Sequence, residues 1–195
     1  MKKQSYKIEI DTTFQDYLPD MPEPEMRVSF ERWLAGRKTL EPIRPWLGRF
    51  PVYVRDPEAP PSDFFNAPCI GLFSISGKVY ADQTMRALLE AAGELLQMEV
   101  TDTAEFIYSF NPLQVSQQKG VVDLARCEWK YGRISRIAFF SECLPDGELF
   151  TIPEYIVVLY ASHSGSLPPE KDFFQWYQRQ GYTGLKFTEA EKAWM

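Results

Sequence analysis

The sequence has few of the residues from which metal centres and disulfide frameworks are built. Its 195 residues include a single histidine and three cysteines, Cys69, Cys127 and Cys143, with no CxxC pair among them. One histidine cannot form a multi-histidine metal site. Three widely spaced cysteines are typical of a protein in a reducing compartment, where the free thiols act as small hydrophobic side chains. The sequence therefore predicts no metal, no cofactor and a cytoplasmic protein.

Long hydrophobic segments are also lacking. The longest apolar run extends from Tyr155 to Ala161, far short of the ~20 residues that a membrane-spanning helix requires. The first residues, Met1 to Ser5, lead into YKIEI without the apolar stretch of a secretory signal. We therefore expect no membrane partner.

Positive charge is in deficit. The chain has 27 acidic and 21 basic residues and a formal net charge of −6, which argues against a nucleic-acid-binding surface and permits a basic protein partner. Simple solubility explains the same charge at least as well. Loops beside a rigid sheet commonly carry binding surfaces, so the acidic residues near predicted turns are the candidate partner-binding residues. They are Asp56 and Glu58 in one loop, and Glu142, Asp146 and Glu148 around the LPDGE turn.

No catalytic motif is present. The sequence contains no G-x-S-x-G, no glycine-rich phosphate-binding loop and no metal-ligand spacing. His163, in ASHSGS, is expected on a loop, where it either is simply solvated or serves as a general base beside Cys127, Cys143 or a serine. Nothing in the sequence brings those groups together. We therefore predict a protein that is not an enzyme, with a hydrolase site near His163 as a less favoured alternative.

The chain length suits one compact domain, or one domain with a smaller lobe. Residues 1–65 contain nine of the 15 prolines, which break long helices, and they are predicted to form an N-terminal lobe of short strands and loops. Strands are expected at 5–10 and 50–54, a loop at 55–63, and either a strand or a helix at 25–34. Residues 66–195 are predicted to form an α+β core, which starts with a buried strand at 69–75.

The middle of the chain carries the clearest helical pattern. Asp82 is a plausible N-cap, and an apolar stripe at helical spacing follows it and predicts a helix that ends near Gln97. The stripe comprises Met85, Leu88, Leu89, Ala92, Leu95 and Leu96. Short strands are then expected at 105–110, 127–131, 133–140, 149–152 and 155–161. In the second of these, alternation places Cys127, Trp129 and Tyr131 inward. Strands so closely spaced predict a mainly antiparallel sheet with two or more helices packed on it.

The aromatic stretch DFFQWYQRQGYTGLKF, residues 172–187, is interpreted as architecture and not as a ligand-binding box. Phe173, Trp176 and Tyr177 share one face of a helix that begins near Pro168 and Pro169, and aromatics at helical spacing usually belong to a core. Gly181 is expected to end this helix in the left-handed conformation, and Gly184 to admit a tight turn. Thr188 and Glu191 are spaced as a capping box, which predicts a last short helix that ends at Trp194.

Several short motifs occur in an order that resembles bacterial immunity proteins of polymorphic toxin systems. They are Asp63-Phe64 before the first buried strand, Asn111-Pro112 after an aromatic strand, and the closing Gly181, Gly184, Leu185 and Phe187. The similarity extends over residues 34 to 190. It implies an α+β fold and a non-enzymatic cytoplasmic protein that binds a cognate toxin and blocks it. It identifies no toxin-contacting residue. A module that binds a small ligand or a peptide is the alternative function.

Overall fold

The structure of the chain is a computed structural model that describes residues 3–20, 31, 39–44, 46, 50–66 and 73–192. The ambiguous element predicted at 25–34 lies outside these residues except for Glu31, which is helical. The start of the strand predicted at 69–75, including Cys69, also lies outside the described residues. The remaining part of that strand is present as Phe73–Ile75.

The first sheet has four antiparallel strands in the order β10-β11-β1-β12. Their bounds are β1 Gln4–Ile10, β10 Leu149–Ile152, β11 Tyr155–His163 and β12 Leu185–Glu189. Strand β11 lies inside the sheet, as its apolar sequence predicted. Leu159 and Ala161 face one apolar cluster and Tyr160 faces another, so both surfaces of the strand are covered.

Within the described part of the chain, the second sheet has six strands in the order β2-β3-β6-β7-β5-β4, of which only the β3–β6 pair is parallel. Their bounds are β2 Tyr17–Pro19, β3 Phe50–Val54, β4 Phe64–Asn66, β5 Phe73–Ile75, β6 Gly93–Val100 and β7 Phe106–Pro112. A separate two-stranded sheet pairs β8 (Glu128–Lys130) with β9 (Arg133–Arg136). Residues 1–65 thus contribute strands to both large sheets.

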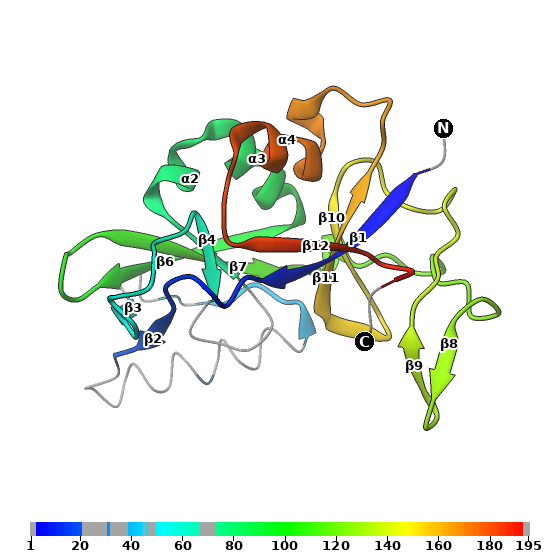
Figure 1. Cartoon of the computed structure of the whole chain (residues 1–195), viewed down its shortest axis with the longest axis horizontal. Helices are drawn as coiled ribbons and strands as arrows, with labels where there is room; N and C mark the ends of the chain where they lie inside the picture. The colour runs from blue at the N-terminus through cyan, green and yellow to red at the C-terminus, as the bar shows by residue number, and fades with distance from the viewer. Residues whose placement is uncertain are drawn as a thin grey trace.

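Three short α-helices that fall wholly within the described residues lie on the same side of the sheets (Figure 1). They are α2 Gly77–Ala81, α3 Gln83–Ala92 and α4 Phe173–Gln180, accompanied by the 3-10 turns η1 Gln114–Ser116 and η2 Pro169–Lys171. The fold is therefore α+β, with mostly antiparallel sheets and helices packed on them, as predicted. Among the described residues, no helix is long and apolar enough to cross a membrane.

The main core lies between the helices and the two sheets. Phe173 and Tyr177 of α4 are buried there beside Phe64 of β4, whose ring lies 6.3 and 5.3 Å from theirs. The predicted N-cap Asp82 is confirmed, since its carboxylate accepts hydrogen bonds from the Thr84 and Met85 amides. The aromatic stretch is thus architectural, and its helix covers the core.

The two large sheets meet at a close backbone approach beside Gly184. The amide of Phe64 donates to the carbonyl of Thr183 at 3.0 Å. Gly184 has φ +100, and a Cβ at this position would collide with the carbonyl of Phe64. The turn predicted at Gly184 is confirmed, and the left-handed conformation of Gly181 at the end of α4 is confirmed with φ +67.

The helix predicted to run from Asp82 to Gln97 is wrong in its second half. It ends at Ala92, and Leu95 and Leu96 belong to β6. Gly93 begins that strand, and a Cβ there would collide with the carbonyl of Asn111 in the neighbouring β7. Tertiary pairing with β7 therefore overrides the helical spacing of the leucines.

Two further predictions are wrong in the second half of the chain. Thr188 lies in β12, opposite Lys7 of β1, so it does not cap a final helix with Glu191; Trp194 lies outside the described residues. In β8, Cys127 is buried next to the strand, but Trp129 and Tyr131 are exposed instead of inward. Among the described residues, no second layer packs over these two side chains.

Candidate functional site

Three segments that are distant in sequence enclose an open groove of about 590 Å3 on the helix side of the molecule. We call it the acidic groove. One wall is α3, the second is the turn at Asp146–Glu148, and the third is the segment from Leu167 to Lys171. The residues that line it are Gln83, Thr84, Ala87, Leu88, Ala91, Asp146, Glu148, Leu167, Glu170 and Lys171.

The lining separates into an apolar floor and a charged rim. Ala87 and Ala91 lie on the face of α3 opposite the buried Met85 and Leu89, and they are small enough to leave the surface hollow. Leu88 and Leu167 complete the apolar part. The rim carries the carboxylates of Asp146, Glu148 and Glu170 against one ammonium group, that of Lys171.

Gly147 holds the acidic turn against the third wall. Its φ of +71 favours glycine, and a Cβ there would lie 2.5 Å from the carbonyl oxygen of Lys171 and 2.8 Å from Leu167 Cδ1. The carbonyl of Gly147 accepts a hydrogen bond from the Phe173 amide at 2.9 Å. The LPDGE sequence therefore sets both the turn and its contact with the start of α4.

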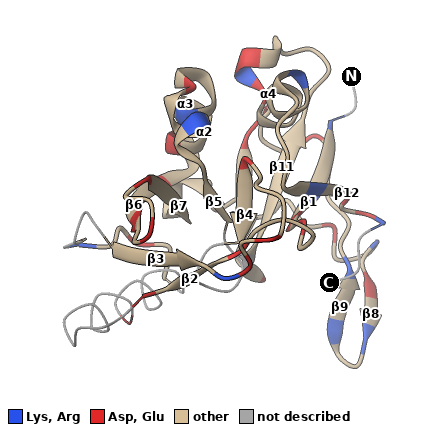
Figure 2. Cartoon of the chain, turned by 60° about the vertical axis from the view of Figure 1, so that its left-hand side comes forward, with Lys and Arg blue, Asp and Glu red and all other residues tan. Residues whose placement is uncertain are grey.

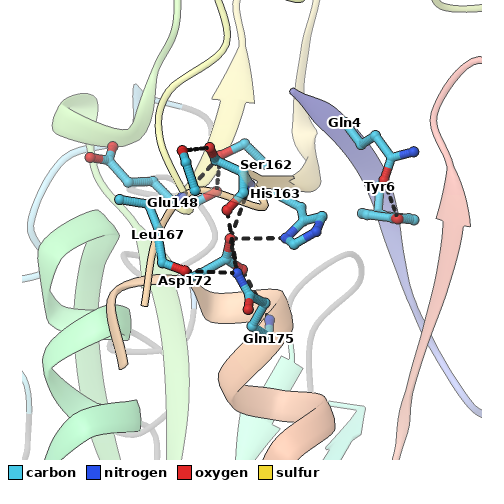
Figure 3. A network of polar contacts seen from close by, with 10 residues as sticks. Gln4, Tyr6, Glu148, Ser162, His163, Leu167, Asp172 and Gln175 are labelled. Carbon is cyan, nitrogen blue, oxygen red and sulfur yellow. Dashed lines mark hydrogen bonds and ion pairs between the residues drawn. The ribbon is translucent and has the colours of Figure 1, made fainter. Parts of the chain in front are cut away.

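Asp172 fixes the segment that forms the third wall. This carboxylate is fully buried and accepts hydrogen bonds from the amides of Ser164 and Gln175 at 3.1 and 3.0 Å, which caps α4. The Gln175 side-chain amide contacts the same carboxylate and donates to the Leu167 carbonyl. Figure 3 shows the contact between Gln175 and the Asp172 carboxylate.

The expectation that His163 is a solvated loop residue without a partner is wrong. His163 is the last residue of β11, and its Nδ1 lies 3.0 Å from Oδ2 of Asp172. In the tautomer that carries its proton on Nδ1, the imidazole donates a hydrogen bond to this carboxylate oxygen. The side chain is 21% exposed and lies beside the ring of Phe174, 5.5 Å between centroids. Asp172, which caps α4, lies nine residues further along the chain, and no motif predicts that the two side chains meet.

A histidine beside an aspartate forms two members of a hydrolytic triad. The other contacts of Asp172, however, are with the amides of Ser164 and Gln175, which it holds at the start of α4. Within the described residues, the imidazole forms no hydrogen bond with a serine, threonine or cysteine side chain. Cys127 is buried in a different cluster, and the Ser164 hydroxyl is engaged with that of Ser166 at 2.7 Å. No group of three metal-binding side chains occurs in the described ranges. The pair therefore orients a wall of the acidic groove.

The charges on the rim are not balanced. Asp146 pairs with Lys3 at 2.9 Å, whereas the Glu148 carboxylate has no hydrogen bond or ion pair with any described residue. Partial burial, together with the neighbouring charge of Asp146, raises the pKa of Glu148 above its ordinary value, and Lys3 offsets only part of this effect. In Figure 3 the Glu148 carboxylate points away from the His163–Asp172 contacts. The groove thus presents a carboxylate that a cationic group would stabilise.

The five acidic residues predicted to bind a partner do not share one site. Asp146 and Glu148 lie on the rim of the acidic groove, and Glu142 is exposed outside its lining. Asp56 and Glu58 belong to the β3–β4 loop, where the Asp56 carboxylate accepts from the Glu58 amide. The sequence analysis did not predict the apolar floor. The signal for it is that Ala87 and Ala91, on the outward face of α3, are small and apolar where an amphipathic helix usually has polar residues.

Comparison with known proteins does not add to these observations. No protein-family model matches the sequence, and a search of curated proteins gives no match.

Proposed function

We propose that this chain is a non-enzymatic, cytoplasmic immunity protein that binds a cognate bacterial toxin and blocks it. The proposal starts from the motif resemblance given above. The observation that carries it further is the acidic groove, in which an apolar floor is bordered by incompletely neutralised carboxylates. This combination suits a protein segment that presents an apolar side chain next to lysine or arginine.

The groove has the properties expected of a protein-binding surface. Such surfaces combine an apolar centre with a polar rim, and charge at the rim increases the association rate and the specificity. The walls are held by Gly147 and by the buried Asp172, so the surface is formed before a partner arrives. The partner expected from this chemistry is basic, in agreement with the acidic character of the chain.

A small-ligand or peptide module is the second candidate, and the same groove supports it. Its volume of about 590 Å3 lies within the ~300–1,000 Å3 typical of small-molecule sites. The groove is open and acidic, however, whereas small-molecule sites bury most of the ligand surface. A toxin segment that continues beyond the groove suits this shape better than an isolated small molecule.

The proposal is tested by recovering the toxin and measuring how it associates. A photo-crosslinking residue at Ala87, on the groove floor, should capture the toxin from the native host, whereas the same residue at Glu142 should not. Stopped-flow association of the purified toxin is then compared for the wild type, for Glu148→Gln with Glu170→Gln, and for Glu142→Gln as the matched control.

We expect the groove variant to associate more slowly and Glu142→Gln to match the wild type. Salt should slow the wild type toward the groove variant, because the Debye length falls from ~10 Å at 0.1 M to ~3 Å at 1 M. Equal effects of the groove and control variants would place the interface elsewhere. Recovery of no toxin from the host would count against the immunity assignment itself.

A further inference from the structure

The second exposed feature of the molecule is the β8–β9 hairpin, residues 128–136, which we call the aromatic hairpin. Its strands pair only with each other, and it projects from the body of the protein in two different views (Figures 1 and 2). Trp129 is 56% exposed and Tyr131 is 94% exposed. Tryptophan and tyrosine are enriched among residues that dominate binding energies, and their joint exposure on a soluble surface indicates an interaction site.

The tip of the aromatic hairpin holds its tyrosine in an unfavourable backbone conformation. Lys130 and Arg133 pair across a two-residue turn in which Tyr131 has φ +52 and Gly132 has φ +73. Such type I′ turns favour asparagine, aspartate or glycine at the first position, because a bulky residue at positive φ is disfavoured. The side chain of this strained residue is 94% exposed. Strained backbone conformations cluster at functional sites. A strained tyrosine whose ring is exposed therefore suits a surface that contacts a partner.

The aromatic hairpin is anchored at its base and basic at its tip. Ile134 is buried, and its carbonyl accepts a hydrogen bond from the Tyr155 hydroxyl at 3.1 Å. Lys130 and Arg133 are exposed and form no ion pair within the described chain, and the Lys130 ammonium lies 5.5 Å from the centre of the Tyr131 ring. The tip is thus a fixed combination of two aromatic rings and two available cations.

This combination is complementary to the acidic groove. The apolar floor of the groove matches the aromatic rings of the tip. The carboxylates of Glu148 and Glu170 on the rim match the cations of the tip, Lys130 and Arg133. Figures 1 and 2 place the aromatic hairpin at the end of the molecule away from α3, so it cannot enter the groove of its own chain. We propose that the aromatic hairpin of one copy docks in the acidic groove of a second copy, so that the protein self-associates head to tail.

A head-to-tail contact has two defined consequences. It joins different surfaces on the two copies, so it produces a reciprocal pair, a larger ring or an open chain, depending on the rotation between the copies. It also occupies the groove assigned to the toxin under the proposed function, so toxin and self-association should compete. The self-association does not depend on that function, because both of its surfaces belong to this chain.

Nucleic acid is the other partner that aromatic and basic side chains can bind, by stacking and phosphate contact. Nucleic-acid surfaces normally need an extended basic face, whereas this hairpin offers two free cations on a chain of net charge −6. Its third cation, Arg136, pairs with Glu128 at 3.1 Å. Charge complementarity therefore favours the acidic groove of a second copy.

Sedimentation velocity of the purified chain over a wide concentration range is the first test. We expect the average mass to increase with concentration, and this increase to weaken in high salt. Trp129→Ala with Tyr131→Ala should raise the apparent dissociation constant at least about tenfold. Glu142→Gln should leave the association unchanged. A wild-type chain that stays monomeric at every concentration would overturn the proposal.

A charge exchange between the two surfaces tests whether they meet each other. One variant carries Lys130→Glu and Arg133→Glu, and the other carries Glu148→Lys and Glu170→Lys. Asp146 is left unchanged because it pairs with Lys3. Each variant alone should be monomeric, because its hairpin and groove then carry the same sign. Their mixture should associate, since each hairpin finds an oppositely charged groove; a mixture that remains monomeric would disprove the pairing.

The same variants separate the alternative partners. Binding of a fluorescent single-stranded oligonucleotide that is lost in Trp129→Ala, by a chain that stays monomeric, would assign the hairpin to nucleic acid and overturn the proposal. No oligonucleotide binding together with concentration-dependent association would support it. Toxin capture at Ala87 is read out independently, so the failure of self-association leaves the proposed function intact, and the reverse also holds.

Discussion

The aromatic residues of α4 lie in the core, whereas those of the aromatic hairpin lie in solvent. Phe173 is fully buried among rings from both sheets, and Tyr131 is 94% exposed. Both segments alternate aromatic with polar residues at the period of their own secondary structure. The difference is that α4 lies on two sheets, whereas β8 and β9 pair only with each other and contact the body of the protein through Ile134. An amphipathic pattern predicts which side of a helix or strand is apolar. Whether that apolar side is buried depends on a neighbouring layer that packs against it.

The two regions also use charged groups differently. At α4, Asp82 and Asp172 are acceptors with several donors each, and they hold helices in place. On the aromatic hairpin and the rim of the acidic groove, Lys130, Arg133 and Glu148 have no ion-pair partner in the described chain. Asp82 and Asp172 thus serve the framework, whereas Lys130, Arg133 and Glu148 are left for the surfaces that we propose for binding.

The largest effect on stability is expected from truncation in the α4 region. Phe173→Ala removes a fully buried ring that contacts Phe64, Tyr177 and Phe187, and it should lower the free energy of unfolding by about 3–5 kcal/mol. Urea unfolding monitored by tryptophan fluorescence measures the loss. An unchanged midpoint would show that α4 is not part of the core, and the contrast with the hairpin would disappear.

A smaller loss is expected at Asp82, which links α3 to α4. Its Oδ2 accepts from Trp176 Nε1 at 2.8 Å and from the Tyr182 hydroxyl at 2.7 Å. Asp82→Asn keeps one oxygen for the N-cap but places an amide against two donors, so we expect a loss of about 2–3 kcal/mol at neutral pH. Trp176→Phe, which removes only one donor, is the matched control and should cost less.

The same carboxylate predicts a pH dependence with a definite sign. Burial opposes the ionisation of Asp82, but hydrogen bonds from Tyr182, Trp176 and the Met85 and Thr84 amides outweigh it, so the pKa of Asp82 lies below its ordinary value of 3.8. A depressed acid pKa stabilises the fold above 3.8, and the contribution is lost as the pH falls through the pKa of the folded state. The stability difference between the wild type and Asp82→Asn should therefore shrink in acid. A constant difference would contradict this account.

The buried contact of His163 predicts an intermediate effect. His163→Ala removes one donor from Asp172, which keeps the amides of Ser164 and Gln175 and the Gln175 side chain, so we expect a loss of about 1 kcal/mol. Thermal unfolding measures it, with Asp172→Ala as the more damaging comparison. If both variants unfold at the wild-type temperature, Asp172 does not organise the third wall of the groove.

The smallest effect is expected at the aromatic hairpin. Trp129→Ala should change the free energy of unfolding by less than ~0.5 kcal/mol, because the ring is 56% exposed and the hairpin is anchored through Ile134. Chemical denaturation measures this, with Phe173→Ala as the reference. A loss comparable to that of the buried phenylalanine would show that the tryptophan packs against the body of the protein, and the surface that we propose for self-association would not be free.

The limits of sequence reasoning are seen most clearly at three residues. Asp82 was identified from its capping chemistry and the pattern that follows it, since both are local. Leu95 and Leu96 continue the helical spacing, yet they form a strand because Gly93 allows β6 to approach β7 too closely for a side chain. Asp146 and Glu148 were found as acidic turn residues, whereas their position opposite α3 depends on packing around Gly147.

The sequence by itself determined the α+β class, the N-cap at Asp82, the turns at Gly181 and Gly184, and the structural role of the 172–187 aromatics, because each depends on local backbone preferences or on the period of the apolar residues. The tertiary structure alone decided that His163 meets Asp172, that three distant segments enclose an acidic groove, and that Trp129 and Tyr131 are exposed. These features depend on which surfaces face each other across the fold, and local preferences do not specify that arrangement.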